Sequence, residues 1–479
     1  MVSFIVSIIL LILGYVFYGR FVAKVFGVDS SRVTPAIASA NGVDYVPMPA
    51  WKVFLIQFLN IAGLGPIFGA IMGAMYGPAA FLWIVFGSIF GGAVHDYLSG
   101  MLSLRRNGAS LPEIIGEELG NVVKQFMRVF ALILMSLVGA VFVSGPAGLL
   151  HGMVTSMSTT AWIIIIFAYY ILATLLPIDK LIGKIYPIFG FALLFMAVGI
   201  LAALFVNNAP IPEITDGLSS QHPKGYPIFP MLFVSIACGA VSGFHATQSP
   251  MMARCLKNEK WGRPCFYGAM IAEGIVALVW AAAASSYFGS VGGLQNFVAS
   301  LPPTANAAAE VVNLISRDWL GKVGGLLAVL GVVAAPITSG DTAFRSARLI
   351  AADFLKIDQT PIVKRLLVSV PIFVIAFLIL QINFDIIWRY FAWSNQTLSV
   401  FTFWALTVYL FKEKRCYWIT LIPALFMTAV CSSYILVAPN PEGFGLPIFV
   451  GYIFAAAVCV LFSILFVLFA RKWKRNNAL

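Results

Sequence analysis

Apolar runs of about 20 residues recur along the whole chain, and each is long enough to cross the hydrocarbon core of a bilayer as a helix. Charged residues make up only 10% of the 479 residues, whereas a soluble globular chain usually carries about a quarter. This composition excludes a cytosolic enzyme, a nucleic-acid-binding domain and a disordered chain. A transmembrane β-barrel would show short alternating segments in place of long continuous runs. We therefore predict an all-α polytopic membrane protein whose surface faces the lipid bilayer.

The boundaries of the apolar runs predict about thirteen transmembrane helices. The predicted spans are 2–19, 52–76, 78–103, 125–150, 160–176, 184–206, 228–250, 266–288, 322–350, 362–381, 386–411, 416–437 and 446–470. When the 30 Lys and Arg residues are assigned to alternate sides of these spans, 26 fall on one side and 4 on the other. Basic residues concentrate in cytoplasmic loops, so the asymmetry predicts an N-terminus outside and a C-terminus in the cytoplasm. The net charge of +11 therefore indicates topology and not a nucleic-acid partner.

The cysteines show neither CxxC nor any metal-ligand spacing, and they lie in or beside apolar runs: Cys238, Cys255, Cys265, Cys416, Cys431 and Cys459. We expect no disulfide framework, no metal site and no cofactor. The first apolar run follows Met1 directly, without a basic region before it or a small-residue cleavage site after it. We interpret it as a retained span and not as a signal peptide.

Two glycine-rich segments interrupt apolar runs at matching places in two five-span units, 52–206 and 228–411. The residues expected to unwind the helices are Asn60, Gly63, Gly65 and Pro66 in the first unit and Gly239, Ser242 and Gly243 in the second. Because five is an odd number, the second unit must enter the membrane from the opposite side. This predicts an inverted-topology repeat in which a discontinuous helix opens each half. The alternative is that the glycines only allow close helix packing.

The segments outside the two units also have predicted roles. Residues 1–51 form an extra helix and a cytoplasmic linker, and residues 412–479 form two extra helices and a basic cytoplasmic tail. Each unit has a short amphipathic segment after its second span, at 110–123 and 304–319, on opposite sides of the membrane. Ser110 and Glu113 have the spacing of a capping box that would start the first of these segments.

Five ionisable residues lie inside predicted spans: His95, Asp96, His245, Glu273 and Asp341. Such residues are costly in a membrane, and each is by default a hypothesis for a functional site. Counting at 1.5 Å per residue puts the last four in one layer roughly 8–11 Å from the inner boundary, where they can form one polar cluster. Structural alternatives remain open for each, and Arg345 stands at the i+4 position to form an ion pair with Asp341.

Small polar residues inside the spans extend the candidate site. Thr338 and Ser339 could provide oxygen ligands for a small cation such as sodium, or they could hold helices together by hydrogen bonds. Asn395 and Gln396 are neutral hydrogen-bonding residues that could bind a substrate carboxylate or amide. Unwound backbone between the two breaks could bind the substrate itself, because half-helix N-termini favour anions and freed carbonyl groups favour cations.

At these motifs the sequence resembles the carbon starvation protein A family, the peptide and pyruvate transporters of bacteria. The matching strings are Phe17-Tyr-Gly19, Thr34-Pro35, Asp44-Tyr-Val-Pro47, Ile61-Ala-Gly-Leu-Gly-Pro66, His95-Asp96-Tyr97, Arg105-Arg106, Ala237-Cys-Gly-Ala-Val-Ser-Gly-Phe-His-Ala246, Pro336-Ile-Thr-Ser339, Asp341, Ala343-Phe-Arg-Ser-Ala-Arg348 and Ser394-Asn-Gln396. The best-known members are considerably longer. The resemblance implies a LeuT-like core of the amino acid–polyamine–organocation superfamily, in the inner membrane of a bacterium.

The resemblance also implies uptake of a carboxylate-bearing nutrient, peptide or pyruvate, driven by the proton gradient during carbon starvation. Asp341 is the leading candidate for the proton acceptor, with Asp96, Glu273, His245 and His95 in the same network. A sodium-coupled symporter of the same substrates is the alternative. A channel would need repeated polar rings along a pore, and a membrane-embedded enzyme would need a nucleophile–base pair or metal ligands. The sequence leaves substrate identity, the coupling ion and the oligomeric state open.

Overall fold

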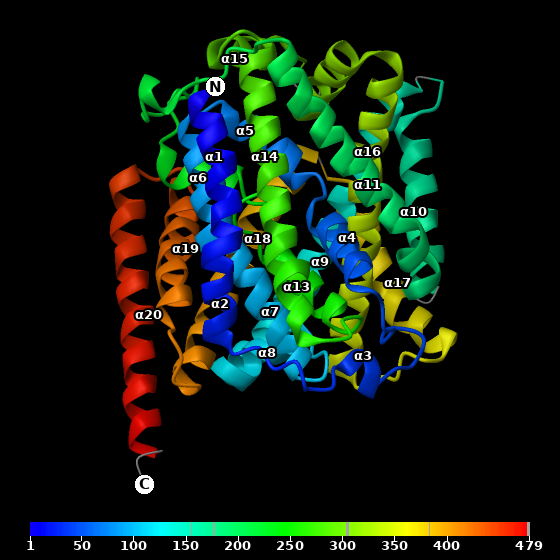
Figure 1. The fold of residues 1–479 in the computed structure, drawn as a ribbon, viewed down its shortest axis with the longest axis vertical. Coiled ribbons are helices and arrows are strands. Elements are labelled where there is room, and N and C mark those ends of the chain that lie inside the picture. Colours follow the sequence, from blue (N-terminus) through cyan, green and yellow to red (C-terminus); the bar gives the residue numbers. More distant parts are fainter. Residues whose placement is uncertain (155, 176–177, 303–305, 383, 477–479) are drawn as a thin grey trace.

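The computed structural model describes residues 1–154, 156–175, 178–302, 306–382 and 384–476, and these residues form a helical bundle (Figure 1). Among these residues, the β-type pairing is limited to an isolated bridge between Met48 and Leu256. The α-helices are α1 (Val2–Leu13), α2 (Gly19–Phe26), α3 (Pro35–Ala38), α4 (Ala50–Ile61), α5 (Ala70–Ala74), α6 (Ala79–Phe86), α7 (Ala93–Arg105), α8 (Leu111–Leu119), α9 (Asn121–Met153), α10 (Thr159–Leu175), α11 (Ile178–Val206), α12 (Phe233–Ser235), α13 (Gly243–Ala253), α14 (Gly268–Tyr287), α15 (Val291–Ser300), α16 (Ala307–Leu355), α17 (Ile362–Ile379), α18 (Phe384–Lys412), α19 (Trp418–Val437) and α20 (Ile448–Asn476).

Short π-helical and 3-10 segments join or extend several of these helices. They are η1 (Gly14–Tyr18), η2 (Gly65–Gly69), η3 (Gly87–Gly92), η4 (Ile214–Asp216), η5 (Ile228–Leu232), η6 (Glu259–Trp261) and η7 (Arg263–Tyr267). Each of η1, η3 and η7 continues directly into an α-helix, so α1 to α2, α6 to α7 and η7 to α14 are continuous rods.

The predicted membrane character is confirmed at the level of a multi-pass helical protein. Among the described residues, eight helices are long and apolar enough to cross a membrane, and nine if the bent pair of α4 with η2 and α5 counts as one span. Helices also occupy the other four predicted ranges, 160–176, 228–250, 322–350 and 386–411, in which residue 176 lies outside the described part.

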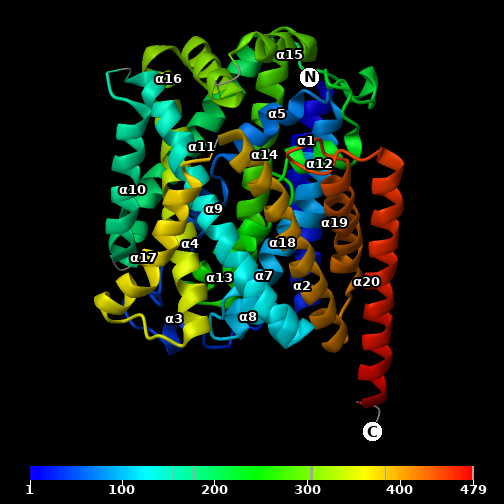
Figure 2. The ribbon, with the colours of Figure 1, turned by 180° about the vertical axis from the view of Figure 1, so that it is seen from behind.

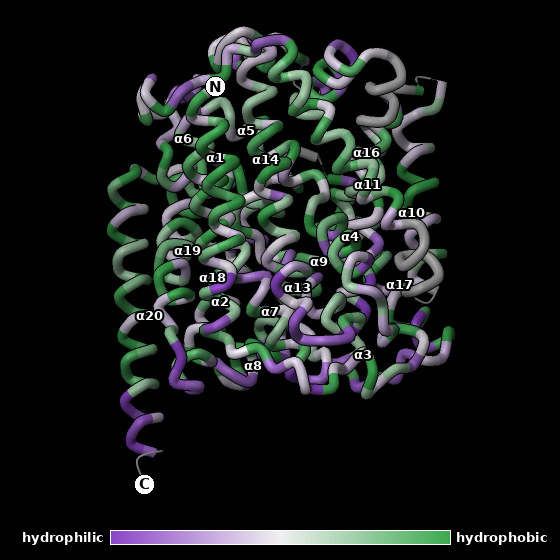
Figure 3. The backbone as a smooth tube through the Cα atoms, viewed as in Figure 1, coloured by the Kyte–Doolittle hydropathy of each residue, from purple (hydrophilic) through white to green (hydrophobic). Residues whose placement is uncertain are grey.

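Three predicted spans are too short at the end that carries Lys or Arg. The first helix continues to Phe26 and not to residue 19, α9 begins at Asn121 and not at residue 125, and α20 continues to Asn476 and not to residue 470. The added turns carry Lys and Arg, whose long apolar stems allow a helix to extend into the polar boundary while the charge stays in water. Hydropathy alone stops at the first such charge. Figure 3 shows this change from apolar to polar along α20.

The two short amphipathic segments lie at opposite ends of the bundle (Figures 1 and 2). One is α8, and the other is the first part of α16, which bends at Gly321, where φ is +65°. Residues 304–305 of the second segment lie outside the described residues. The predicted capping box is wrong, because Ser110 makes no capping hydrogen bond and the Glu113 carboxylate pairs with Lys124 and Arg128 of α9.

Candidate functional site

Two helices are interrupted in the interior of the bundle, as predicted. The α4 helix ends at Ile61, and the chain resumes a helical path at Gly65 with a bend of 54° between the two parts. The second interruption lies between Ser235, where α12 ends, and Gly243, where α13 begins. Gly239 within it has φ of +89°, a conformation that side chains disfavour.

The two interruptions contact each other. A Cβ atom built on Gly65 would lie 2.0 Å from the Cβ of Cys238, and one built on Gly239 would lie 3.4 Å from the Cα of Pro66. Both glycines therefore permit a close approach of backbone to backbone. The structure brings together the two segments that the sequence placed in different halves of the chain.

The start of α13 is capped by a residue from a distant helix. The side-chain Oδ1 of Asn395, on α18, accepts hydrogen bonds from the backbone N–H of Phe244 at 2.5 Å and from the Ser242 hydroxyl at 3.1 Å. A helix N-terminus leaves N–H groups without partners and attracts negative charge, so this oxygen stands where an anionic group would be stabilised. Gln396 differs, because its Nε2 donates to the carbonyl of Phe233 at 2.6 Å.

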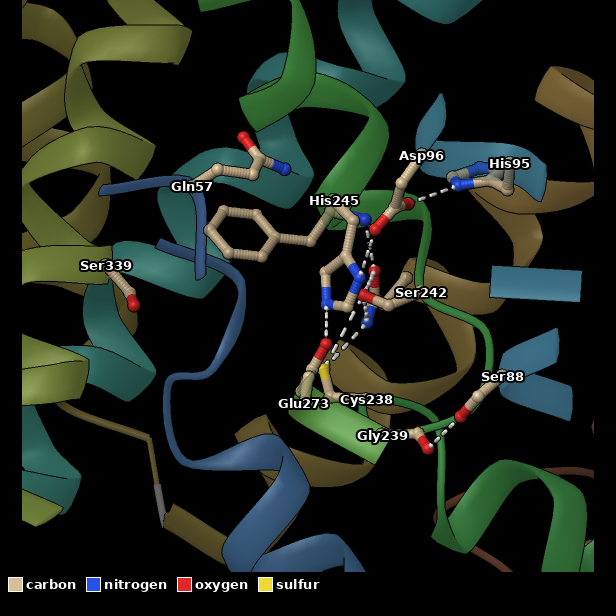
Figure 4. Close-up of polar contacts among 12 residues, drawn as sticks. Gln57, Ser88, His95, Asp96, Cys238, Gly239, Ser242, His245, Glu273 and Ser339 are labelled. Atoms are coloured by element: carbon tan, nitrogen blue, oxygen red, sulfur yellow. Dashed lines mark hydrogen bonds and ion pairs between the residues drawn. The ribbon is translucent and has the colours of Figure 1, made fainter. Parts of the chain in front are cut away.

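A chain of buried ionisable groups begins one residue further along α13. The Nδ1 of His245 lies 3.1 Å from Asp96 Oδ2, and its Nε2 lies 3.5 Å from Glu273 Oε2. The other oxygen of Asp96 lies 2.9 Å from Nδ1 of His95. All four side chains are inaccessible to solvent. Figure 4 shows the His245 ring between the two carboxylates, which come from α7 and α14. We call His95, Asp96, His245 and Glu273 the histidine–carboxylate cluster.

Asp341 lies in a different contact from the one predicted. Its Oδ2 accepts a hydrogen bond of 2.5 Å from the hydroxyl of Tyr186, on α11, and its other oxygen has no hydrogen-bond partner in the described part of the chain. The four-membered layer expected from depth is therefore divided, since Asp96, His245 and Glu273 meet and Asp341 pairs with α11. Depth along each helix fixes height in the membrane but not which helices are neighbours.

The guanidinium of Arg345 also has partners other than the predicted one. Its Nη2 donates to the carbonyl of Ala173 at 3.1 Å, and its Nη1 lies 3.7 Å from Oδ1 of Asp44. Asp44 belongs to the linker between the first two spans, so this contact joins the linker to α16.

The hydroxyls considered for a cation site point in two directions. The Ser339 hydroxyl lies 3.0 Å from the carbonyl of Leu59, at the last turn of α4, and 2.9 Å from the carbonyl of Ala335 in its own helix, whereas the Thr338 hydroxyl donates to Ala335 alone at 2.8 Å. A Cβ atom on Gly63 would lie 3.2 Å from the Ser339 hydroxyl. Asn60 is buried in the same turn, and both atoms of its amide lack a hydrogen-bond partner among the described residues.

The sequence did not predict three further polar contacts at the second interruption. The Sγ of Cys238 lies 3.5 Å from the hydroxyl of Ser242, the hydroxyl of Ser88 donates to the carbonyl of Gly239 at 3.0 Å, and Trp83 donates to the carbonyl of Ile236 at 2.9 Å. The last two satisfy carbonyls that the interruption leaves without helical partners. A search for polar side chains in spans next to the breaks would have found Ser88.

A pocket of about 410 Å³ lies beside the ends of both interrupted helices that are nearer the N-terminus of the chain. The pocket is lined by Tyr76, near the end of α5, and by Ser235 of α12. Gln295 of α15 and His222, in the loop between η4 and η5, complete this polar lining. Burial and the nearby Lys224 lower the pKa of His222 to about 4, so its ring is neutral at neutral pH. The residues that line this pocket come from α5, α12 and α15, which lie near the end of the bundle where the N-terminus lies (Figure 1).

The chain is similar to a known family. A family model described as carbon starvation protein CstA matches residues 1–145 and 144–319. An uncharacterized membrane protein of Haemophilus influenzae is 45% identical over 351 residues, which cover 63% of this chain and 95% of that protein.

Other relatives carry functional names, and two of them illustrate the range. The peptide transporter CstA of Bacillus subtilis is 27% identical, with 98% of this chain and 96% of that protein covered. The pyruvate/proton symporter BtsT of Escherichia coli is 30% identical over 58% of this chain and 48% of its own length. Both names describe transporters and not enzymes.

The fold is also similar to that of a solved transporter. The crystal structure of a mutant manganese transporter of Eremococcus coleocola superposes with a TM-score of 0.57 over 91% of this chain and 99% of that chain. The identity is 12%, so the likeness shows a shared fold alone.

Proposed function

Because the chain belongs to the carbon starvation protein CstA family of transporters, we propose that it is a symporter that imports a small carboxylate-bearing nutrient, peptide or pyruvate, with the proton gradient as its driving force. The nutrient would be taken up during carbon starvation.

One observation carries this proposal. Consecutive residues of α13 would serve the cargo and the proton. The N–H of Phe244 donates to Asn395, where the carboxylate of the cargo would bind, and the ring of His245 lies between the carboxylates of Asp96 and Glu273. A carboxylate that replaces the Asn395 oxygen at this helix start would pull on the same turn that holds His245. Cargo binding and proton exchange are thereby linked through a single rigid turn.

The substrate would lie between the two interruptions, beside the backbone of Gly63, Gly65, Pro66, Gly239 and Gly243. Ser242, Asn395, Gln396, Asn60 and His245 would surround it. Exposed N–H groups at a helix start favour a carboxylate over a neutral group. Asn60 supports this location, because a buried amide without a partner is costly and gains hydrogen bonds when a polar ligand arrives.

The coupling proton would move within the protein's buried acids. Buried charges are stable only when they are balanced, so the two carboxylates and two imidazoles of the histidine–carboxylate cluster would exchange protons when their surroundings change from dry to wet. Asp341 would be the leading acceptor, and Arg345, one turn later on the same helix, would adjust its charge. Alternate exposure of these groups to the two sides would couple proton entry to cargo entry.

The architecture proposed for this cycle has thirteen spans in the bacterial inner membrane. Units 52–206 and 228–411 form a LeuT-like inverted repeat of five helices each, flanked by the extra helices of 1–51 and 412–479. The broken helices, the amphipathic segments at opposite ends and the fold likeness to the manganese transporter support this arrangement. The N-terminus would lie outside and the C-terminus in the cytoplasm.

A sodium-coupled symporter is the second candidate. The observation that favours it is the approach of the Ser339 hydroxyl to the Leu59 carbonyl, at 3.0 Å, where α4 begins to unwind. Freed carbonyl and hydroxyl oxygens at such a place are ligands that a small hard cation prefers.

The test is uptake of labelled pyruvate and of a labelled dipeptide into proteoliposomes, with pH and sodium gradients imposed separately. We expect an inward proton gradient to concentrate one of the two, with saturation and counterflow. Accumulation driven by sodium alone would favour the second candidate. Flux without saturation or counterflow would indicate a channel and contradict both.

A further inference from the structure

The linker between the first two spans is fixed to the inner ends of several helices. The backbone N–H of Met48 donates to the carbonyl of Cys255 at 3.0 Å, and the hydroxyl of Tyr45 donates to the carbonyl of Asn107 at 3.0 Å. The guanidinium of Arg254 covers the Tyr45 ring at 5.0 Å. In Figure 1 this part of the chain passes beneath the bundle, on the side opposite the N-terminus.

The linker inserts one carboxylate between two buried arginines. Arg345 and Arg348 lie on consecutive turns of α16, and neither is accessible to solvent. The Oδ1 of Asp44 lies 2.9 Å from Nη2 of Arg348 and 3.7 Å from Nη1 of Arg345. The Nε of Arg348 has no hydrogen-bond partner among the described residues. We call Arg345 and Arg348 the arginine pair.

The arginine pair has the chemistry of a carboxylate-binding site. Planar guanidinium groups bind carboxylates through paired, charge-assisted hydrogen bonds, and a buried guanidinium is stable only with such a partner. Burial alone would raise the pKa of Asp44, but the nearby guanidiniums of Arg348, Arg345 and Arg254 hold this pKa below its usual value. Asp44 therefore remains charged at neutral pH.

A seam of buried polar side chains leads from the helix interruptions toward the arginine pair. Gln57 of α4 donates to the hydroxyl of Ser249 at 3.1 Å, and Gln248 of α13 donates to the hydroxyl of Ser346 at 3.3 Å. The carbonyl oxygens of both glutamine side chains lack hydrogen-bond partners in the described part of the chain. Buried amide oxygens without partners are costly unless another state of the protein supplies water or a polar ligand.

We propose that Arg345 and Arg348 form a second carboxylate-binding site, on the cytoplasmic exit route, and that Asp44 occupies it in this conformation as a tethered substitute for the carboxylate of the cargo. The direction of exit rests on the proposed function. A carboxylate that arrives along the seam replaces Asp44, which releases the linker and opens the route. After the cargo leaves, Asp44 returns and closes the route again.

The binding site is tested with Asp44→Ala in the purified protein. Removal of the tethered carboxylate vacates its position beside Arg345 and Arg348, and we expect the thermal midpoint to fall and to recover in a millimolar series of sodium acetate or sodium pyruvate. Sodium chloride at equal ionic strength should give no recovery. The matched control is Asp29→Ala, since Asp29 is an exposed carboxylate of the same linker. Equal effects of acetate on the wild type, on Asp29→Ala and on Asp44→Ala would overturn the proposal.

The occupancy of the site by Asp44 is tested with Cys255, which the linker covers and which is inaccessible to solvent. The background is Cys416→Ser with Cys459→Ser, because these two cysteines are the accessible ones among the described residues. Asp44→Asn preserves the shape and removes the charge. We expect maleimide labelling of Cys255 to increase roughly 5–30-fold, the ratio that follows from losing one such interaction. Unchanged labelling would overturn the proposal.

Neither readout requires transport. A protein that binds acetate in place of Asp44 but transports neither pyruvate nor a dipeptide would contradict the proposed function and leave the carboxylate site established. A protein that transports normally but shows no acetate effect would contradict the carboxylate site alone.

Discussion

Asn395 offers the sharpest test of where the cargo carboxylate binds. Its Oδ1 accepts from the N–H of Phe244 at the start of α13. Asn395→Asp places a carboxylate beside this N–H, at a helix start that favours negative charge, and so occupies the place proposed for the carboxylate of the cargo. We expect a folded protein whose KM for uptake is raised at least about tenfold, equivalent to 1.4 kcal/mol.

The control for the added charge is Asn207→Asp, at a residue directly after α11 whose side chain donates to the carbonyl of Ala203. Its KM should stay at the wild-type value. If Asn395→Asp also takes up substrate with the wild-type KM, the carboxylate does not bind at the start of α13.

Asp341 is the residue on which proton coupling is most directly tested. In Asp341→Asn the side chain keeps its size and can still accept from Tyr186, so the packing between α16 and α11 is preserved. We expect proteoliposomes with this variant to exchange substrate across the membrane but not to concentrate it under an inward proton gradient. A purely structural Asp341 predicts loss of both activities with the fold. Accumulation at the wild-type level would show that Asp341 is not the acceptor.

At the scale of the elements, the two interruptions depend on a contact that has room for only one Cβ atom. The Cβ of an alanine at position 65 would lie 2.0 Å from that of Cys238. Gly65→Ala should therefore lower the free energy of unfolding by about 1–3 kcal/mol, as overpacking does. Cys238→Gly removes the opposing atom, so the double variant should lose less stability than the sum of the two single variants.

The measurement is a double-mutant cycle from unfolding in detergent, with Cys238→Gly alone as the reference for the lost sulfur contacts. A coupling free energy near zero would mean that the two breaks do not pack against each other, and the proposed cargo site between them would lose its walls.

The sequence was informative about elements and less so about their partners. Long apolar runs predicted helices in all thirteen ranges, and glycine and proline predicted both interruptions, because these signals act within about 20 residues of chain. The partner of Asp341 is 155 residues away and that of Arg348 is 304 residues away. Nothing in local hydropathy specifies such pairs. Asp44 therefore drew attention only as part of a family motif, and the histidine–carboxylate cluster was expected to include Asp341.

At the scale of the whole molecule, the distribution of basic residues predicts one orientation in the membrane, and a natural cysteine can report it. Cys416 lies between α18 and α19, beside Lys414 and Arg415, and it is the exposed cysteine among the described residues. The positive-inside rule places this loop in the cytoplasm. An impermeant maleimide should therefore label Cys416 in inside-out vesicles and not in intact cells.

Cys416→Ser is the control, since it should abolish the signal in inside-out vesicles. A cysteine introduced at Ser219, in the loop between α11 and η5, should show the opposite pattern, with labelling in intact cells. This pair of sites makes the test independent of labelling efficiency. Labelling of Cys416 from outside would show that the protein has the opposite orientation in the membrane. The arginine pair and its linker would then face the entry side. The outer pocket and the exit route would exchange roles, so the direction of the proposed symport depends on this result.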